Sequence, residues 1–186
     1  MLITEGLRVA PAHKLLAFGN NCYSHPMSNN DQDKHITMMK QFNVRVYGIL
    51  INAQNQLLVS DELIKGSHFT KFPGGGLEWG EGTRDCLARE FKEELDQPID
   101  VLEHFYTTDY FQPSAFRETD QLISIYYRVK LVGKQRFEAK LAPFNFPSDA
   151  GLQCELPRWV ALADLNAADF KWPVDQRVVK QLKVSS

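Results

Sequence analysis

The sequence has little of several features that mark special classes of protein. It holds only three cysteines in 186 residues, Cys22, Cys86 and Cys154, and their scattered positions form neither a metal-ligand pair nor an even disulfide set. No apolar run approaches the roughly 20 residues that a membrane-spanning helix needs. The short apolar run at residues 14–18 is followed by no convincing signal-peptidase site. Free thiols and a cytoplasmic location are therefore expected.

An excess of one charge is also absent. Lysine and arginine (21 residues) nearly balance aspartate and glutamate (23 residues), so the formal net charge is −2 and the pI is near 6.2. A basic excess is the electrostatic mark of proteins that bind nucleic acid or anionic membranes. The sequence therefore predicts neither as a partner. The apolar fraction of 44% and this length suffice for one domain with a hydrophobic core.

The chemically informative part of the chain lies between residues 72 and 95, FPGGGLEWGEGTRDCLAREFKEEL. Three consecutive glycines, Gly74 to Gly76, precede a stretch from Cys86 to Leu95 that contains no glycine or proline. This pattern predicts a glycine loop that leads into a helix. Thr83 is the expected N-cap, and Asp85 suits the first helical turn. An apolar arc on this helix is formed by Leu87, Ala88, Phe91 and Leu95.

Glu90, Glu93 and Glu94 fall on a neighbouring arc of the same helix. Like charges at spacings of three and four residues repel by about 0.2–0.5 kcal/mol per pair on an exposed helix, and more where they are partly buried. A divalent cation among the carboxylates would remove this repulsion, and Mg²⁺ takes such oxygen ligands together with phosphate. A solvated acidic face is the alternative explanation. The adjacent glycine turn favours the cation, because such turns let the backbone approach a phosphate or a metal.

The spacing of these residues resembles the Nudix box, the signature of the Nudix hydrolases. The matching positions are Gly75, Glu81, Arg89, Glu90, Phe91, Glu93, Glu94 and Leu95. Two positions after the acid pair depart from the pattern, because Asp96 replaces the family's glycine and Gln97 replaces an apolar residue. Aspartate tolerates the left-handed conformation better than most residues. We therefore expect a slightly different exit from the helix and an intact site.

The remaining chain also resembles a Nudix domain, an α/β fold in which helices sandwich a mixed β-sheet. Residues 1–40 fall outside the resemblance and are expected to form a partly ordered N-terminal extension, with residues 41–186 as the Nudix domain. The expected strands are 43–51, 56–60, 68–72, 99–111, 121–131 and 155–162, followed by a closing helix at 173–184. The first two strands are expected to pair as a hairpin, and the expected loops are 61–67, 112–120 and 133–151.

The resemblance implies hydrolysis of the pyrophosphate linkage of a nucleoside diphosphate derivative, with Mg²⁺ or Mn²⁺ as cofactor. Such ions neutralise phosphate oxygens and lower the pKa of a bound water. The implied metal ligands are the Gly74 carbonyl, Glu90, Glu93 and Glu94. The implied catalytic residues are Glu93, Glu94 and Arg89, with Arg89 orienting the carboxylates. Gly75 and Glu81 are implied to support the loop–helix junction or the outer metal shell.

The box does not fix the general base or the substrate. The base is either a box glutamate or an acid from a distant loop. Glu118 and Asp120 are the loop candidates, although ordinary surface charge explains either one alone. Arg117 and Phe111 are candidate substrate-binding residues, and weaker candidates are Tyr47, Trp79, Gln112, Phe116 and Arg136. The aromatic flanks of the 112–120 loop favour a nucleotide sugar over a nucleoside triphosphate.

Two other functions are compatible with the sequence. A Nudix domain that senses a nucleotide without turnover is the first, and the complete acid set argues against it. A purely structural acidic helix is the second, and it predicts that Mg²⁺ leaves the thermal stability unchanged. A nucleotide-linked small molecule is the expected partner. A homodimer stays open because many Nudix relatives pair as dimers.

Overall fold

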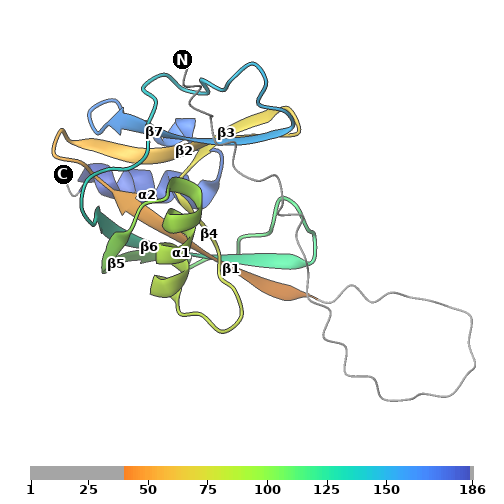
Figure 1. The fold of residues 1–186 in the computed structure, drawn as a ribbon. Coiled ribbons are helices and arrows are strands. Elements are labelled where there is room, and N and C mark those ends of the chain that lie inside the picture. Colours follow the sequence, from red (N-terminus) through yellow and green to blue (C-terminus); the bar gives the residue numbers. More distant parts are fainter. Residues whose placement is uncertain (1–39, 185–186) are drawn as a thin grey trace, which may run out of the picture. The chain divides into compact units, whose positions relative to one another are not determined.

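The structure, a computed structural model, describes residues 40–184 (Figure 1). The expected N-terminal extension therefore lies outside the described residues, apart from Lys40. Within this part of the chain, no helix is both long and apolar enough to cross a bilayer. The elements, in chain order, are β1 (Gln41–Leu50), β2 (Gln56–Ile64), β3 (Ser67–Lys71), β4 (Gly74–Gly76), α1 (Thr83–Leu95), β5 (Ile99–Thr107), β6 (Asp120–Leu131), β7 (Gln153–Ala161), a 3₁₀-helix (Ala167–Asp169) and α2 (Pro173–Val184).

The strands form two sheets. The first has the order β4-β1-β6-β5, with β1 parallel to β6 and the two outer pairs antiparallel. The second has the order β3-β2-β7 and is antiparallel throughout. The expected mixed sheet is thus confirmed.

The expected hairpin between residues 43–51 and 56–60 is wrong. β1 and β2 belong to different sheets and are joined only by an isolated bridge between Ile51 and Leu57. Alternating apolar residues on both sides of a turn were compatible with a hairpin. They were equally compatible with a chain that passes from one sheet to the next, because both strands are buried on two faces.

The hairpin of this region is formed by β2 and β3, where a loop at 61–67 was expected. Its two turn residues, Lys65 and Gly66, both have positive φ, 49° and 81°. This is the mirror-image turn geometry that suits the twist of two strands. The sequence did not predict this hairpin, because lysine is much rarer at the first turn position than asparagine or glycine.

The two helices cover opposite faces of the sheets. Successive residues of β1 alternate between them: Val46 packs in the core that contains Leu87 and Phe91 of α1, whereas Tyr47 packs in the core that contains Val178 of α2. Figure 1 shows α1 in green and α2 in blue on the two sides of the strands. The α/β/α sandwich predicted from the sequence is therefore confirmed.

Gly48 lets α1 approach β1 closely. A Cβ atom at this position would lie 2.7 Å from Cε2 and 2.8 Å from Cζ of the fully buried Phe91 ring. The ring therefore rests directly on the β1 backbone. This contact sets the distance between the sheet and the helix that carries the acidic face.

We expect Gly48→Ala to lower the free energy of unfolding by about 1–3 kcal/mol, because the Phe91 ring has to move in a tightly packed core. Urea denaturation measures this change. Lys180→Ala on the exposed face of α2 is the control and should change stability by no more than about 0.5 kcal/mol. Equal stabilities of Gly48→Ala and the wild type would contradict the packing argument.

Asp175 on α2 is a buried carboxyl group with one unpaired oxygen. Its Oδ1 accepts a hydrogen bond of 2.6 Å from the Tyr126 hydroxyl, whereas Oδ2 has no partner among the described residues. Burial raises the pKa of Asp175 to about 7. The native state therefore holds this proton more tightly than the unfolded chain does. The stabilising contribution is complete below about pH 4 and is lost as the pH rises to about 7.

Asp175→Asn should remove this pH dependence, since the amide oxygen still accepts the Tyr126 hydrogen bond and carries no charge. Between pH 5 and pH 8, the free energy of unfolding of the wild type should fall by at least about 1 kcal/mol more than that of the variant. Denaturant titrations at the two pH values provide the comparison. Parallel pH profiles would show that Asp175 does not titrate in this range.

Candidate active site

The expected glycine loop is in fact the short strand β4, since Gly74–Gly76 pair with β1; the segment, for which we keep the name glycine loop, permits two close approaches that any side chain would block. Gly74 has φ of 131°, a conformation that favours glycine, and a Cβ there would overlap the backbone of Val46. A Cβ on Gly75 would overlap the carboxylate of Glu90. The loop therefore joins β1 on one side and receives an acid of α1 on the other.

The start of α1 differs from the expectation. The N-cap is Gly82, not Thr83, and no side chain caps the helix. Thr83 is the first helical residue, and its hydroxyl lies 2.9 Å from the hydroxyl of Tyr127 on β6. The prediction failed because a tertiary partner uses the Thr83 side chain. Asp85 does lie in the first turn, as expected.

The end of α1 agrees with the expectation. Asp96 adopts the left-handed conformation, with φ of 50° and ψ of 28°, and its N–H donates to the Lys92 carbonyl. The second departure from the Nudix pattern, Gln97, is fully buried. Its amide donates to the carbonyls of Pro98 and Val132, and its side-chain oxygen accepts from the Arg136 N–H. The polar side chain thus anchors the helix exit to the segment after β6.

Arg89 fastens the acidic helix to the glycine loop. Its guanidinium donates two hydrogen bonds to Glu81, of 2.7 and 3.0 Å, and one of 3.0 Å to the Gly76 carbonyl. The same group donates to Glu90 at 2.8 Å and to Glu93 at 3.3 Å. Glu81 also accepts a hydrogen bond of 2.8 Å from the Glu78 N–H. These contacts hold three carboxylates around one guanidinium, which is the geometry that the predicted role of Arg89 requires.

A second group of charged residues, which the sequence did not reveal, adjoins the glycine loop from the β2-β3-β7 sheet. The Lys71 ammonium lies 2.7 Å from Glu62, 3.4 Å from Glu155 and 3.1 Å from the carbonyl oxygen of Gly74. Ser60 donates a hydrogen bond to Glu155. The sequence does show Lys71 just before Phe72. Its acidic partners depend on the register of β2, β3 and β7, and the wrong hairpin prediction gave no correct register.

Electrostatic coupling connects this group with α1. Desolvation, together with the neighbouring Glu155 carboxylate, raises the pKa of Glu94, although part of the side chain is exposed. Desolvation also raises the pKa of Glu62. Desolvation works to lower the pKa of Lys71, but the carboxylates of Glu155, Glu94 and Glu62 outweigh it and raise that pKa well above its ordinary value. The site therefore holds more carboxylates than cations and favours further positive charge.

The loop residues predicted from the sequence lie elsewhere or have other partners. Glu118 is exposed, and no hydrogen bond or ion pair within residues 40–184 connects it with the acids of α1. Asp120 is buried, accepts from the Thr119 hydroxyl and lies 3.9 Å from Arg117. Phe111 is 69% exposed. Among the described residues, the side-chain partners of Asp120 are thus its own loop neighbours and not box residues.

The aromatic candidates divide between core and surface. Tyr47 is buried and stacks on Tyr126, so it is a core residue and has no open face for a base. Its hydroxyl accepts a hydrogen bond of 3.1 Å from Arg45, whose guanidinium lies beside Gly76. Trp79 is fully exposed, and Phe116 contacts Trp172 edge-on at 5.8 Å.

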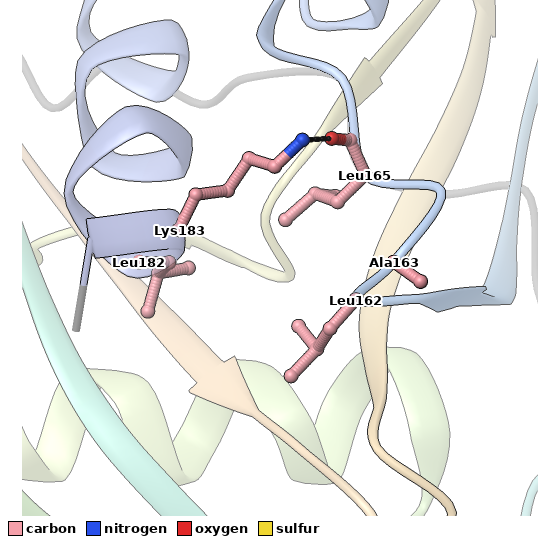
Figure 2. Close-up of a pocket in the computed structure, with 5 residues that line it drawn as sticks. All are labelled: Leu162, Ala163, Leu165, Leu182 and Lys183. Carbon is pink, nitrogen blue, oxygen red and sulfur yellow. Dashed lines mark hydrogen bonds between the residues drawn. The ribbon is translucent and has the colours of Figure 1, made fainter. Parts of the chain in front are cut away.

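A small pocket of about 210 Å³ lies away from these charged groups. Figure 2 shows its lining residues on the turn after β7 and at the end of α2. Lys183 donates a hydrogen bond of 2.7 Å to the Leu165 carbonyl at this pocket. No carboxylate lines it, so its chemistry does not suit phosphate or metal binding, and the glycine loop remains the better candidate.

The donor atoms near the glycine loop fit Mg²⁺ or Mn²⁺ in kind. They are carboxylate oxygens, the ligands that hard divalent ions prefer. Among residues 40–184, no three acidic, histidine or cysteine side chains converge closely enough to hold an ion as they stand. The present partners explain this: Arg89 holds Glu90, and Lys71 uses the Gly74 carbonyl. Glu93 and Glu94 have exposed side chains on the rigid helix, and Arg89 donates a hydrogen bond to Glu93, so binding an ion needs new rotamers of these acids.

A mixed sheet between two helices, with a glycine loop leading into an acidic helix, is the arrangement that the Nudix resemblance implies. The model of the NUDIX domain family matches residues 41–182, which is most of the chain. The chain therefore belongs to the NUDIX domain family. This confirms the predicted class, a Nudix pyrophosphohydrolase, and leaves the substrate as a separate question.

Individual relatives agree with this assignment. The 8-oxo-dGTP diphosphatase of Escherichia coli (strain K12) is 26% identical over 147 residues, which span 78% of this chain and 98% of that protein. The solution structure of the E. coli ORF135 protein has a TM-score of 0.58 at 16% identity, covering 80% of this chain and 93% of that one. A NUDIX hydrolase from Nitrosomonas europaea has a TM-score of 0.54 at 16% identity, covering 77% and 89%. The similarity to these two structures shows the fold.

Arg89→Lys should loosen the junction, because lysine keeps the charge but cannot donate two parallel hydrogen bonds to Glu81. The Arg89 hydrogen bonds lower the pKa of Glu81 to about 2, so the pair stabilises the fold at neutral pH and loses this contribution as the pH falls from about 4 to about 2. We expect the variant to lose about 1–3 kcal/mol at pH 7 and the Glu81 pKa to move towards its ordinary value.

Denaturant titrations and a carboxyl NMR titration measure these two changes. Lys92→Gln is the control, because Lys92 forms only an exposed ion pair with Asp96 on the same helix. An unchanged Glu81 pKa in Arg89→Lys would contradict the assigned role of the guanidinium.

Proposed function

We propose that the chain is a divalent-metal-dependent hydrolase that cleaves the pyrophosphate linkage of a nucleoside diphosphate derivative, either a nucleoside triphosphate or a nucleotide sugar. The observation that carries the proposal is the surplus of carboxylates around the glycine loop. Glu62, Glu90, Glu94 and Glu155 gather there, and Glu93 adjoins them on α1. Without a further cation, such crowding only costs stability.

The similarity to an 8-oxo-dGTP diphosphatase supports a nucleotide as substrate. This similarity favours a nucleoside triphosphate as substrate, whereas the aromatic flanks of the 112–120 loop favoured a nucleotide sugar. Phe111 and Phe116 of that loop segment are exposed and able to contact a base, whichever nucleotide is bound. A reducing, cytoplasmic location stays part of the proposal, supported by the free thiols of Cys86 and Cys154.

Glu90, Glu93 and Glu94 would hold Mg²⁺ or Mn²⁺. The fourth expected ligand, the Gly74 carbonyl, already accepts a hydrogen bond from Lys71. When bound, the ion would neutralise phosphate oxygens and make a water more acidic. Arg89 keeps Glu90 in place by a hydrogen bond of 2.8 Å, so that this carboxylate needs little reorganisation.

Without a bound ion, Glu94 is the box glutamate whose raised pKa favours a role as proton acceptor. Desolvation and Glu155 raise its pKa. A carboxylate with a raised pKa is a stronger base, and general bases work best with a pKa near the working pH. Arg45, beside Gly76, and Lys71 supply positive charge on the strand side of the loop, where the phosphates would be oriented.

Hydrolysis assays with Mg²⁺ or Mn²⁺ test the proposal. The panel should include dGTP, 8-oxo-dGTP, ATP, UDP-glucose and ADP-ribose, with products separated by chromatography so that the broken bond is identified. We expect turnover of at least one class. Glu93→Gln and Glu94→Gln should each lower kcat by roughly 10²-fold or more, whereas the exposed control Glu138→Gln should keep it.

Two outcomes would contradict the proposal. If the wild type binds nucleotides but releases no product above the level of the two variants, the chain is a nucleotide sensor. If neither Mg²⁺ nor Mn²⁺ changes the melting temperature or the turnover, the acidic helix is purely structural.

A further inference from the structure

The Lys71 side chain has the surroundings of a coordinated cation. Three oxygens surround its ammonium group: Glu62 at 2.7 Å and Glu155 at 3.4 Å form ion pairs with it, and the Gly74 carbonyl accepts a hydrogen bond of 3.1 Å. The side chain is only 6% exposed. Two carboxylates and a backbone carbonyl are also the kinds of oxygen that divalent ions take in proteins.

The strand register shows why a cation is needed at this point. Glu62 on the central strand β2 and Glu155 on β7 are direct cross-strand partners, so their side chains share one face of the sheet. Like charges in this arrangement destabilise a sheet. Lys71 on β3, opposite Ser60, reaches the same face from the other side of β2. Its ammonium therefore compensates two like-charged carboxylates on one face of the sheet.

We propose that Lys71 is a built-in cation of the active site, which takes the place of one divalent ion between the Gly74 carbonyl and the carboxylates of Glu62 and Glu155. This inference rests on the proposed function, since it concerns the metal content of that site. The wild-type chain then binds one ion fewer than its carboxylates could hold. The acids of α1 keep their own ion, and the Gly74 carbonyl is left out of the wild-type ligand set.

A merely structural lysine makes a different prediction. If Lys71 only neutralises the buried Glu62, its removal destabilises the protein and no ion is gained. If Lys71 occupies a cation position, its removal opens that position to a metal. The number of bound ions therefore separates the two roles, whereas activity alone does not.

The experiment counts Mn²⁺ ions per folded chain, by electron paramagnetic resonance of the free ion and by calorimetric titration. Lys71→Met, which keeps an unbranched side chain one atom shorter and without charge, should bind one more Mn²⁺ than the wild type. Lys71→Arg, which keeps the charge, should retain the wild-type number. The control Lys92→Met, which removes a lysine from an exposed ion pair on α1, should also retain it.

Lys71→Met leaves two acids without their partner, so a second variant guards against misfolding. Lys71→Met/Glu62→Gln removes the closest ion pair as a unit and keeps Glu155 and the Gly74 carbonyl for the added ion. It should also bind one more Mn²⁺ than the wild type. An unchanged or lower number in whichever of these two variants folds, judged by circular dichroism, overturns the role of Lys71.

Failure of this inference and failure of the proposed function give different results. A wild type that binds Mn²⁺ and hydrolyses a nucleotide, while the Lys71 variants gain no ion, rejects the built-in cation alone. A wild type that binds no Mn²⁺ and hydrolyses nothing rejects both.

Discussion

The electrostatic balance around the glycine loop is the constraint on which the rest of the structure depends. Acids from α1, β2 and β7 converge on three glycines, and the fold compensates them with only a few cations. Arg89 divides its donors between the loop and the helix, with hydrogen bonds to the Gly76 carbonyl, Glu81 and Glu90. Lys71 links the loop and the second sheet, because it donates to the Gly74 carbonyl and forms ion pairs with Glu62 and Glu155. The remaining negative charge is what the proposed divalent ion would compensate, in a chain with almost no net charge.

The two-sheet architecture brings these groups together. β1 carries the glycine loop as its antiparallel neighbour β4, while Gly48 lets the Phe91 ring of α1 rest on the same strand. The second sheet supplies Glu62, Lys71 and Glu155 from three adjacent strands. A buried network between Asp61, Arg158 and Thr70 fixes these strands on the opposite side of β2. Helix α1 and strands β2, β3 and β7 therefore hold most of the charged site, and Glu81 joins it from the segment before α1.

The part of this account that could be predicted from the sequence depends on local spacing. The helix, its acidic arc, the glycine loop and the left-handed exit at Asp96 all follow from residues close together in the chain. The partners from β2, β3 and β7 could not be predicted, because cross-strand contacts depend on register and on a turn at Lys65-Gly66 that lacks the usual residues. Thr83 shows the same limit, since its hydroxyl is used by Tyr127, 44 positions away in the sequence. The charged residues Glu62, Lys71 and Glu155 inside apolar strand sequences were a signal of this second charged group.

We propose that the acids of α1, beside the glycine loop, form the metal site of a nucleotide hydrolase. A crystal structure with Mn²⁺ and a non-hydrolysable nucleotide analogue tests it most directly. The account predicts an anomalous peak at coordination distance, about 2.1 Å, from oxygens of Glu90 and Glu94, with the phosphates on its open side. A Mn²⁺ peak bound elsewhere, with these side chains turned apart and no ion between them, would contradict it.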